Sequence, residues 1–129
     1  MSDIQKQEHD HFKIFSGSLG ENSSLGSLAD EVADFVAEEK VAAKSIGVEY
    51  LEEAKRLIIT LGYRKDEEFY PVRLTGVGLG KVEDLATRDD FSQLERAIRE
   101  ASQKVERIIC HELYITEGHE FLMVFMSHE

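Results

Sequence analysis

The chain has 129 residues, 42% of them hydrophobic, and a formal net charge of -11 at pH 7, the balance of an ordinary globular domain. An acidic surface repels phosphate backbones, so we expect no nucleic-acid partner. The longest apolar run, 121–126, is far shorter than the ~20 residues that cross a bilayer, so we expect no membrane partner either. A single cysteine, Cys110, suits a reducing compartment, and we read the chain as one compact cytoplasmic domain.

The first half of the chain predicts a strand, a loop and a helix. Residues 1–11 are polar and indicate a flexible tail, and residues 12–15 are typical of a short strand. The Gly- and Ser-rich stretch 16–26 predicts a loop. A helix is expected over 27–39, with its apolar stripe at helical spacing: Leu28, Val32, Phe35 and Val36.

The segment 46–61 admits two interpretations. Its centre, 51–56, has high helix propensity, so one continuous helix over 48–61 is an alternative. Apolar residues nevertheless alternate on both sides of that centre, which favours a β-hairpin with a short polar turn. A charged linker is expected over 64–69.

The second half, 70–129, predicts the same succession of elements. A strand begins at Val72 and a glycine-rich loop follows at 76–81. A helix is then expected, with either Asp90 and Gln93 or Thr87 and Asp90 supplying its cap. Its buried stripe comprises Leu94, Ala97, Ile98 and Ala101. Two strands, 108–115 and 121–126, flank a three-residue turn, 116–118, in which Gly118 is expected to take the left-handed conformation.

A shift of 64 residues aligns 40–63 on 104–127 without a gap, and it places Tyr50 on Tyr114. The predicted fold is therefore α+β, a tandem duplication of a β-α-β-β unit, 12–63 and 70–129. An antiparallel sheet carries two packed helices, and the first strand of each unit joins its third. The second unit supports the hairpin interpretation of the first, because its turn is the plainer of the two.

The run 121–126 is apolar on both faces of its strand, which indicates that both faces are covered. Either the other half of the chain or a second chain supplies that cover. We therefore expect a homo-oligomer as well as a compact domain.

The glycine-rich stretch is the first candidate ligand site. A phosphate loop would need Gly where Thr75 stands and a hydroxyl where Val82 stands, so its spacing does not fit. Gly76, Gly78 and Gly80 still predict a loop at one end of the sheet, where a small ligand could bind.

The second candidate is the strand that contains Cys110, His111 and Glu112. Alternation along a strand places His111 opposite to its two neighbours, so a Cys–His catalytic pair is poorly placed and Cys110 is expected in the core. His119 lies about four residues out of register with His111, roughly 13 Å at ~3.3 Å per residue, too far for a shared metal. Glu112 would be partly buried, and we hypothesise a ligand contact or an interface hydrogen bond there.

Tyr50 and Tyr114, as equivalent residues, could line two symmetric pockets; the alternative is that both are core residues with a hydroxyl at the rim. No Ser-His-Asp order and no zinc spacing occurs, so no catalytic residue, metal or cofactor is assigned. We expect a non-enzymatic oligomeric binding or assembly module, with a small-molecule ligand left open. The alternatives are an enzyme around Glu112, Tyr114 and 76–81, and a protein–protein adaptor.

Residues 70–126 resemble the β-α-β-β build of dodecins, small acidic oligomeric proteins that bind or store flavins. The resemblance rests on strand 72–76, on the helix that opens at Phe91 and Ser92, and on strands 107–115 and 120–126. It implies self-association and a small-molecule ligand. Dodecins are single units, whereas this chain is tandem, and it has no tryptophan to stack on a flavin. No flavin-binding residue is therefore carried over.

Overall fold

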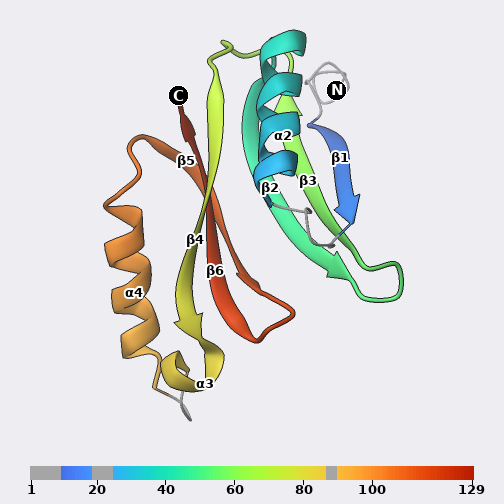
Figure 1. The fold of residues 1–129 in the computed structure, drawn as a ribbon. Coiled ribbons are helices and arrows are strands. Elements are labelled where there is room, and N and C mark those ends of the chain that lie inside the picture. The colour runs from blue at the N-terminus through green and yellow to red at the C-terminus, as the bar shows by residue number, and fades with distance from the viewer. Residues whose placement is uncertain (1–9, 19–24, 87–89) are drawn as a thin grey trace, which may run out of the picture.

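The computed structural model describes residues 10–18, 25–86 and 90–129, and it has an α+β architecture with two three-stranded antiparallel sheets (Figure 1). The strands are β1 (His11–Ser18), β2 (Ala42–Leu51), β3 (Arg56–Arg64), β4 (Val72–Lys81), β5 (Ile108–Ile115) and β6 (Glu120–His128). The helices are α2 (Leu25–Glu39), α3 (Val82–Leu85) and α4 (Ser92–Ser102). Within the described residues, no helix combines the length and the apolar character needed to cross a membrane.

Each half of the chain places its last strand in the middle of its sheet. The strand orders are β1-β3-β2 and β4-β6-β5, and every pairing is antiparallel. The α+β prediction and the pairing of first with third strand are thereby confirmed. The strands form two separate sheets rather than one, and α3 was not predicted. That the two halves arose by duplication stays a prediction.

The segment that could have been a helix is a hairpin. Strands β2 and β3 pair from Ala42 opposite Arg64 to Leu51 opposite Arg56, which leaves 52–55 as the turn. Its apolar residues alternate between buried and less buried, as in the run around Val48, which is 5% exposed. Burying one face of each strand outweighs the helix propensity of the polar turn.

The second hairpin is one residue tighter at its tip. The Thr116 N–H donates to the Glu120 carbonyl at 2.8 Å, and three residues, 117–119, form the turn. The left-handed residue there is His119, with φ 59°, and not Gly118 as predicted. A local Thr116 contact also helps, because its Oγ1 accepts a hydrogen bond from the Glu120 N–H at 3.2 Å.

The ungapped alignment of the two halves is therefore wrong by one residue along β5. Tyr50 stands opposite Leu57 in the first sheet, whereas Ile115 stands opposite Phe121 in the second. Since Leu57 and Phe121 are the aligned pair, the counterpart of Tyr50 is Ile115. Tyr114 consequently points to the other face of its sheet, and the equivalence of the two tyrosines is corrected.

The side chain of Asp90, just before helix α4, bonds to the first residue of the helix. The Asp90 Oδ1 atom accepts a hydrogen bond from the Ser92 N–H at 3.0 Å, which satisfies one of the free donors at a helix start. The N-cap residue is Phe91 and it makes no side-chain cap hydrogen bond, so Asp90 bonds to the helix start from one residue before the N-cap, while Thr87 lies outside the described residues. Leu94 and Ala101 are buried, and Ala97 and Ile98 are half-buried.

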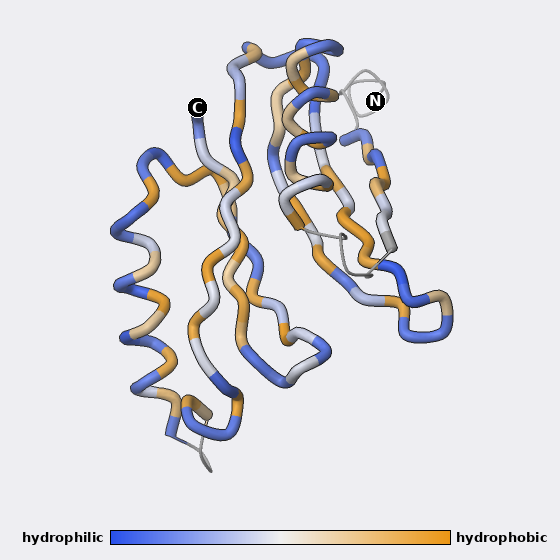
Figure 2. The backbone as a smooth tube through the Cα atoms, in the orientation of Figure 1, coloured by the Kyte–Doolittle hydropathy of each residue, from blue (hydrophilic) through white to orange (hydrophobic). Residues whose placement is uncertain are grey.

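The main core lies between the two sheets. The sheets meet along β2 and β5, and α2 packs against both β1 and β4 (Figure 1). Phe35 of α2 makes edge-on ring contacts with Phe15 and Tyr63, at centroid distances of 5.7 and 5.4 Å. Figure 2 shows the apolar residues concentrated on the strands and on one side of each long helix. The two sheets therefore touch along β2 and β5, α2 fills the rest of the space between them, and α4 packs on the far side of the second sheet.

Both faces of β6 are covered from within the chain. Val124 and Met126, 0% exposed, belong to the main core, while Met123 and Phe125 pack with Ala101 beneath α4. Of the two sources of cover that the sequence allowed, the other half of the chain is the one found. The two-faced strand therefore gives no support for an oligomer.

Candidate functional site

One broad face is left uncovered by the residues that the structure describes: the side of the first sheet opposite α2, called here the outer face. It follows from alternation, because Phe15 points into the core and its neighbours along β1 must point away. Phe12 and Ile14 are 65% and 63% exposed, and Leu51 on β2 is 45% exposed. The outer face comprises Phe12, Ile14, Ser16, Ser45, Gly47, Glu49, Leu51, Arg56, Ile58, Thr60, Gly62 and Arg64.

The outer face has a raised edge and a low floor. Phe12 and Ile14 stand along β1, whereas β2 carries Ser45 and Gly47 across the sheet. A Cβ added at Gly47 would meet only the Thr60 Cβ, at 4.0 Å. The floor is therefore open at Gly47.

The charge of the outer face differs from that of the whole chain. It carries one acidic residue, Glu49, and two arginines, in a protein with a net charge of -11. Arg56 donates to the Ser16 Oγ at 3.0 Å, and Arg64 is held by Asp66 at 3.1 Å at the far end. The middle of the face is uncharged.

A second candidate is a hollow of about 370 Å³ at the tips of the two hairpins, called here the tyrosine pocket. It forms where β2 and β5 lie side by side, and both hairpin tips lie at the same end of the molecule in Figure 1. The pocket is lined by Tyr50, Glu52, Tyr114, Ile115, Thr116, Glu117 and His119. The two predicted tyrosines thus meet in one pocket instead of lining two.

The one-residue register difference explains why they meet. Tyr50 points to the α2 side of the first sheet, toward Leu57, and Tyr114 points to the opposite side of the second sheet, toward Leu122. Those two sides are the ones that face each other across the main core. Had the ungapped alignment held, Tyr114 would lie on the α4 side, away from Tyr50.

The electrostatics of the pocket are set by its carboxylates. Partial burial, and then Glu117 and Glu52, raise the pKa of Tyr50 above its usual range. Partial burial, Tyr50 and Glu117 likewise raise the pKa of Tyr114. A negative potential disfavours the phenolate, so both hydroxyls stay protonated and neutral.

The three predicted glycines do not form a loop. Gly76, Gly78 and Gly80 lie within β4, which runs on to Lys81 with a bulge between Gly78 and Gly80. The strand continues through the glycine-rich stretch because β6 offers it backbone partners along its length. Strand β6 also separates β4 from β5, so these glycines are not brought to the tyrosines.

Cys110 and His111 lie on opposite sides of β5, as alternation predicted. Cys110 is half-buried against the main core, and His111 is exposed. Glu112 is half-buried opposite Val124, and it is not among the residues that line the tyrosine pocket. The enzyme hypothesis around Glu112 and Tyr114 therefore gains no support from the geometry.

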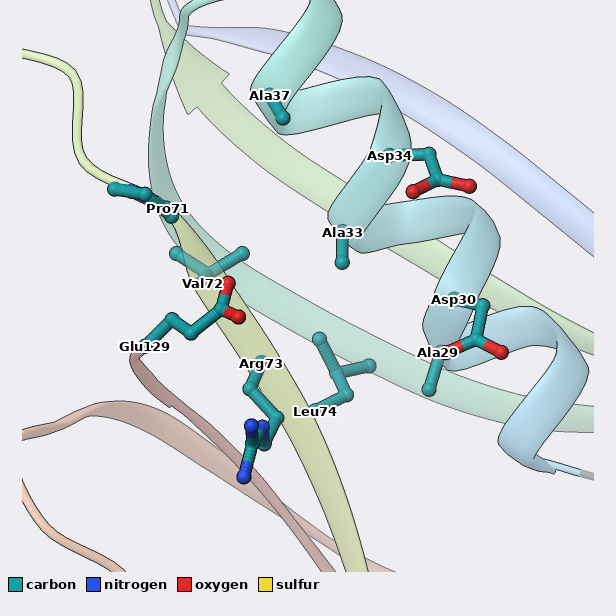
Figure 3. Close-up of a pocket in the computed structure, with 10 residues that line it drawn as sticks. All are labelled: Ala29, Asp30, Ala33, Asp34, Ala37, Pro71, Val72, Arg73, Leu74 and Glu129. Carbon is teal, nitrogen blue, oxygen red and sulfur yellow. The ribbon is translucent and has the colours of Figure 1, made fainter.

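A groove of about 320 Å³ between α2 and β4 escaped the sequence analysis, because its two sides are some forty residues apart in the chain. Ala29, Ala33 and Ala37 line its helix side (Figure 3). Arg73 lies on β4, and Figure 3 shows its guanidinium pointing away from the Asp34 carboxylate. No ion pair between Arg73 and the groove's carboxylates is found among the described residues, so we assign the groove no ligand.

Sequence reasoning found the tyrosines but not Glu52, Glu117 and His119. Their positions in the sequence could have indicated them, since all three lie in the hairpin turns that follow Tyr50 and Tyr114. Comparison with protein-family models, with curated proteins and with solved structures finds no match for this chain.

Proposed function

We propose that the chain is a non-enzymatic assembly module that pairs with a second copy of itself through the outer face of the first sheet. The observation that carries this proposal is the uncovered apolar ridge of Phe12 and Ile14. Exposed apolar side chains gathered on one flat face are typical of interaction surfaces. Its dodecin-like features, small size and self-association, are part of the same proposal, as is a cytoplasmic location.

The order of layers supports a second copy as the occupant. In the chain itself, each sheet has a helix on one side, and the second sheet is covered on its other side by the first half. Among the described residues, the two most exposed large apolar side chains, Phe12 and Ile14, lie on the first sheet at one end of the stack, whereas Leu113 and Ile115 of the second sheet are 39% and 50% exposed.

Open-ended stacking of copies is disfavoured, because α4 at the other end presents a charged surface. Its exposed residues include Glu95, Arg96, Arg99 and Glu100. Two outer faces meeting about a two-fold axis can instead place the ridge of one copy on the glycine floor of the other. The outer face also carries a single carboxylate, Glu49, in a chain of net charge -11, which limits the repulsion between two copies that meet there.

Sedimentation equilibrium of the full chain tests the proposal. We expect a dimer, and we expect Ile14→Glu to weaken it at least about tenfold, because each copy would bury an unpaired carboxylate. Gly47→Lys should act in the same way, since the open floor accepts the side chain in the monomer but not in the dimer.

Phe91→Glu is the matched control. Phe91 is 48% exposed at the start of α4, and the substitution adds the same charge away from the outer face. A wild-type chain that stays monomeric at high concentration would overturn the proposal and leave the face to a different protein. Equal weakening by Ile14→Glu and Phe91→Glu would do so as well.

A further inference from the structure

We propose that the tyrosine pocket binds an alkylammonium group between its two phenol rings and its two carboxylates. The inference is independent of self-association, because the pocket lies at the hairpin tips and the outer face lies on the other side of the first sheet. It rests on the lining residues, on the unpaired state of the two tyrosine hydroxyls and the two glutamates among them, and on the size of the hollow.

The aromatic rings favour a cation. Tyr50 and Tyr114 line the same hollow from two different sheets. The face of a phenol ring carries negative charge density, and an ammonium group held against it gains electrostatic attraction. Their hydroxyls have no hydrogen-bond partner among the described residues, so a ligand meets neutral rings that no other group engages.

The carboxylates favour the same ligand. Glu52 and Glu117 reach the pocket from the two turns, and neither has an ion pair within the described part of the chain. No lysine or arginine lines the pocket. An anionic ligand would be repelled there, while a cation would neutralise two charges that the fold leaves uncompensated.

The volume of the pocket and the apolar part of its lining restrict the chemical class of the ligand. A hollow of about 370 Å³ is at the small end of ligand sites. Ile115 contributes an apolar wall, which suits the carbon atoms of an amine better than a hydrated metal ion. A small organic cation with a short aliphatic part therefore fits best.

Choline and its uncharged carbon isostere, 3,3-dimethylbutan-1-ol, are the probes. The chain has no tryptophan and four tyrosines, so tyrosine emission reports directly on a set of which two line the pocket. We expect choline to bind about two- to fivefold more tightly than the alcohol, the ratio that one exposed cation–ring contact supplies. Equal binding of the two probes, or binding of neither, would overturn the proposal.

A pair of isoelectric variants locates the site. Glu117→Gln should weaken choline binding about threefold, whereas Glu53→Gln, an exposed turn residue outside the pocket, should leave it unchanged. Tyr114→Phe should retain binding, because the ring face is kept, and Tyr114→Leu should lose it. If both glutamate variants weaken binding equally, the attraction is general to the acidic surface and the pocket is not the site.

A second titration separates the sources of an ammonium group. Nα-acetyl-lysine amide imitates the side chain of another protein, and choline imitates a free small molecule. Tighter binding of choline assigns the site to small molecules, and tighter binding of the lysine amide assigns it to a protein partner. Either result depends on Glu117 in the same way.

Discussion

The fold has a clear effect on the ionisation of the Cys110 thiol. Burial raises its pKa from 9.0 to about 11, and the nearby Glu112 carboxylate adds to the rise, against a smaller opposing effect from the Ile46 backbone. Because the thiolate is the reactive form, the native protein should react with a thiol reagent at pH 8 about 100-fold more slowly than the unfolded chain. Absorbance of released thionitrobenzoate, with and without denaturant, measures the ratio.

The same shift predicts a loss of stability in alkali. Above pH 9 the unfolded chain releases the Cys110 proton while the native state keeps it, so the unfolded state binds fewer protons and the free energy of unfolding falls as the pH rises toward 11. Below pH 9 the contribution is fully present. Urea unfolding at several pH values should show this decline in the wild type, and Cys110→Ala should lack that part of it.

Two glycines of β4 predict opposite responses to the same substitution. Gly80 has φ 139°, a region that favours glycine, and an added Cβ would lie 3.1 Å from the Leu85 Cδ1 atom. Gly80→Ala should therefore destabilise by about 1–3 kcal/mol. Gly78 has nothing within 4 Å of an added Cβ, so Gly78→Ala should be neutral or should stabilise by up to about 1 kcal/mol.

Urea unfolding of the wild type and of the two variants tests this pair of predictions, through the change in midpoint at constant m-value. Equal destabilisation by both substitutions would mean that Gly78 is needed for a reason other than backbone conformation, such as the ligand contact expected from the sequence.

At the scale of single residues, the sequence indicated which side chains matter better than where they point. Tyr50 and Tyr114 were predicted to occupy equivalent positions in the two halves. They share a pocket because they are not equivalent: Tyr50 points to the helix side of its sheet, and Tyr114 points to the side opposite α4. The face to which a strand residue points depends on the length of the hairpin turn. The free energies of a three-residue and a four-residue turn are too similar for the amino-acid composition to predict which one forms.

Among the elements, the start of α4 depends on a single side chain. The hydrogen bond from the Ser92 N–H lowers the pKa of Asp90 below 3.8. The stabilisation is therefore present above the ordinary carboxyl range and is lost as the pH falls through the depressed pKa. Asp90→Ala should lower the urea midpoint at neutral pH and have little effect in strong acid, and Asp90→Asn should be the milder change.

Helices and strands were predictable wherever apolar residues kept a regular spacing. The alternation of apolar residues around Val48 and Ile59 identified a hairpin, although the sequence of its turn has high helix propensity. The apolar stripe of α2 identified a helix. The glycine-rich part of β4 was missed, because glycine has no side chain to show alternation. Only the backbone partners on β6, some forty residues later, make it a strand.

At the scale of the whole molecule, α2 joins the two sheets into one cooperative unit. Leu28, 3% exposed, packs over Gly17 of the first sheet, and the other side of the helix packs against β4. Leu28→Ala should cost about 2–5 kcal/mol. The loss should appear equally in hydrogen exchange of the β3 and β6 amides, whereas a loss confined to β3 would show that the halves unfold separately.

Three alanines, Ala29, Ala33 and Ala37, line the groove between α2 and β4. During synthesis, this helix leaves the ribosome well before β4 exists to cover it. Until β4 is synthesised, the methyl groups of the alanines expose little apolar surface. The nascent first half should therefore aggregate less than it would with leucines at these three positions. The shallow seam between helix and strand is thus suited to a protein whose two halves are completed at different times.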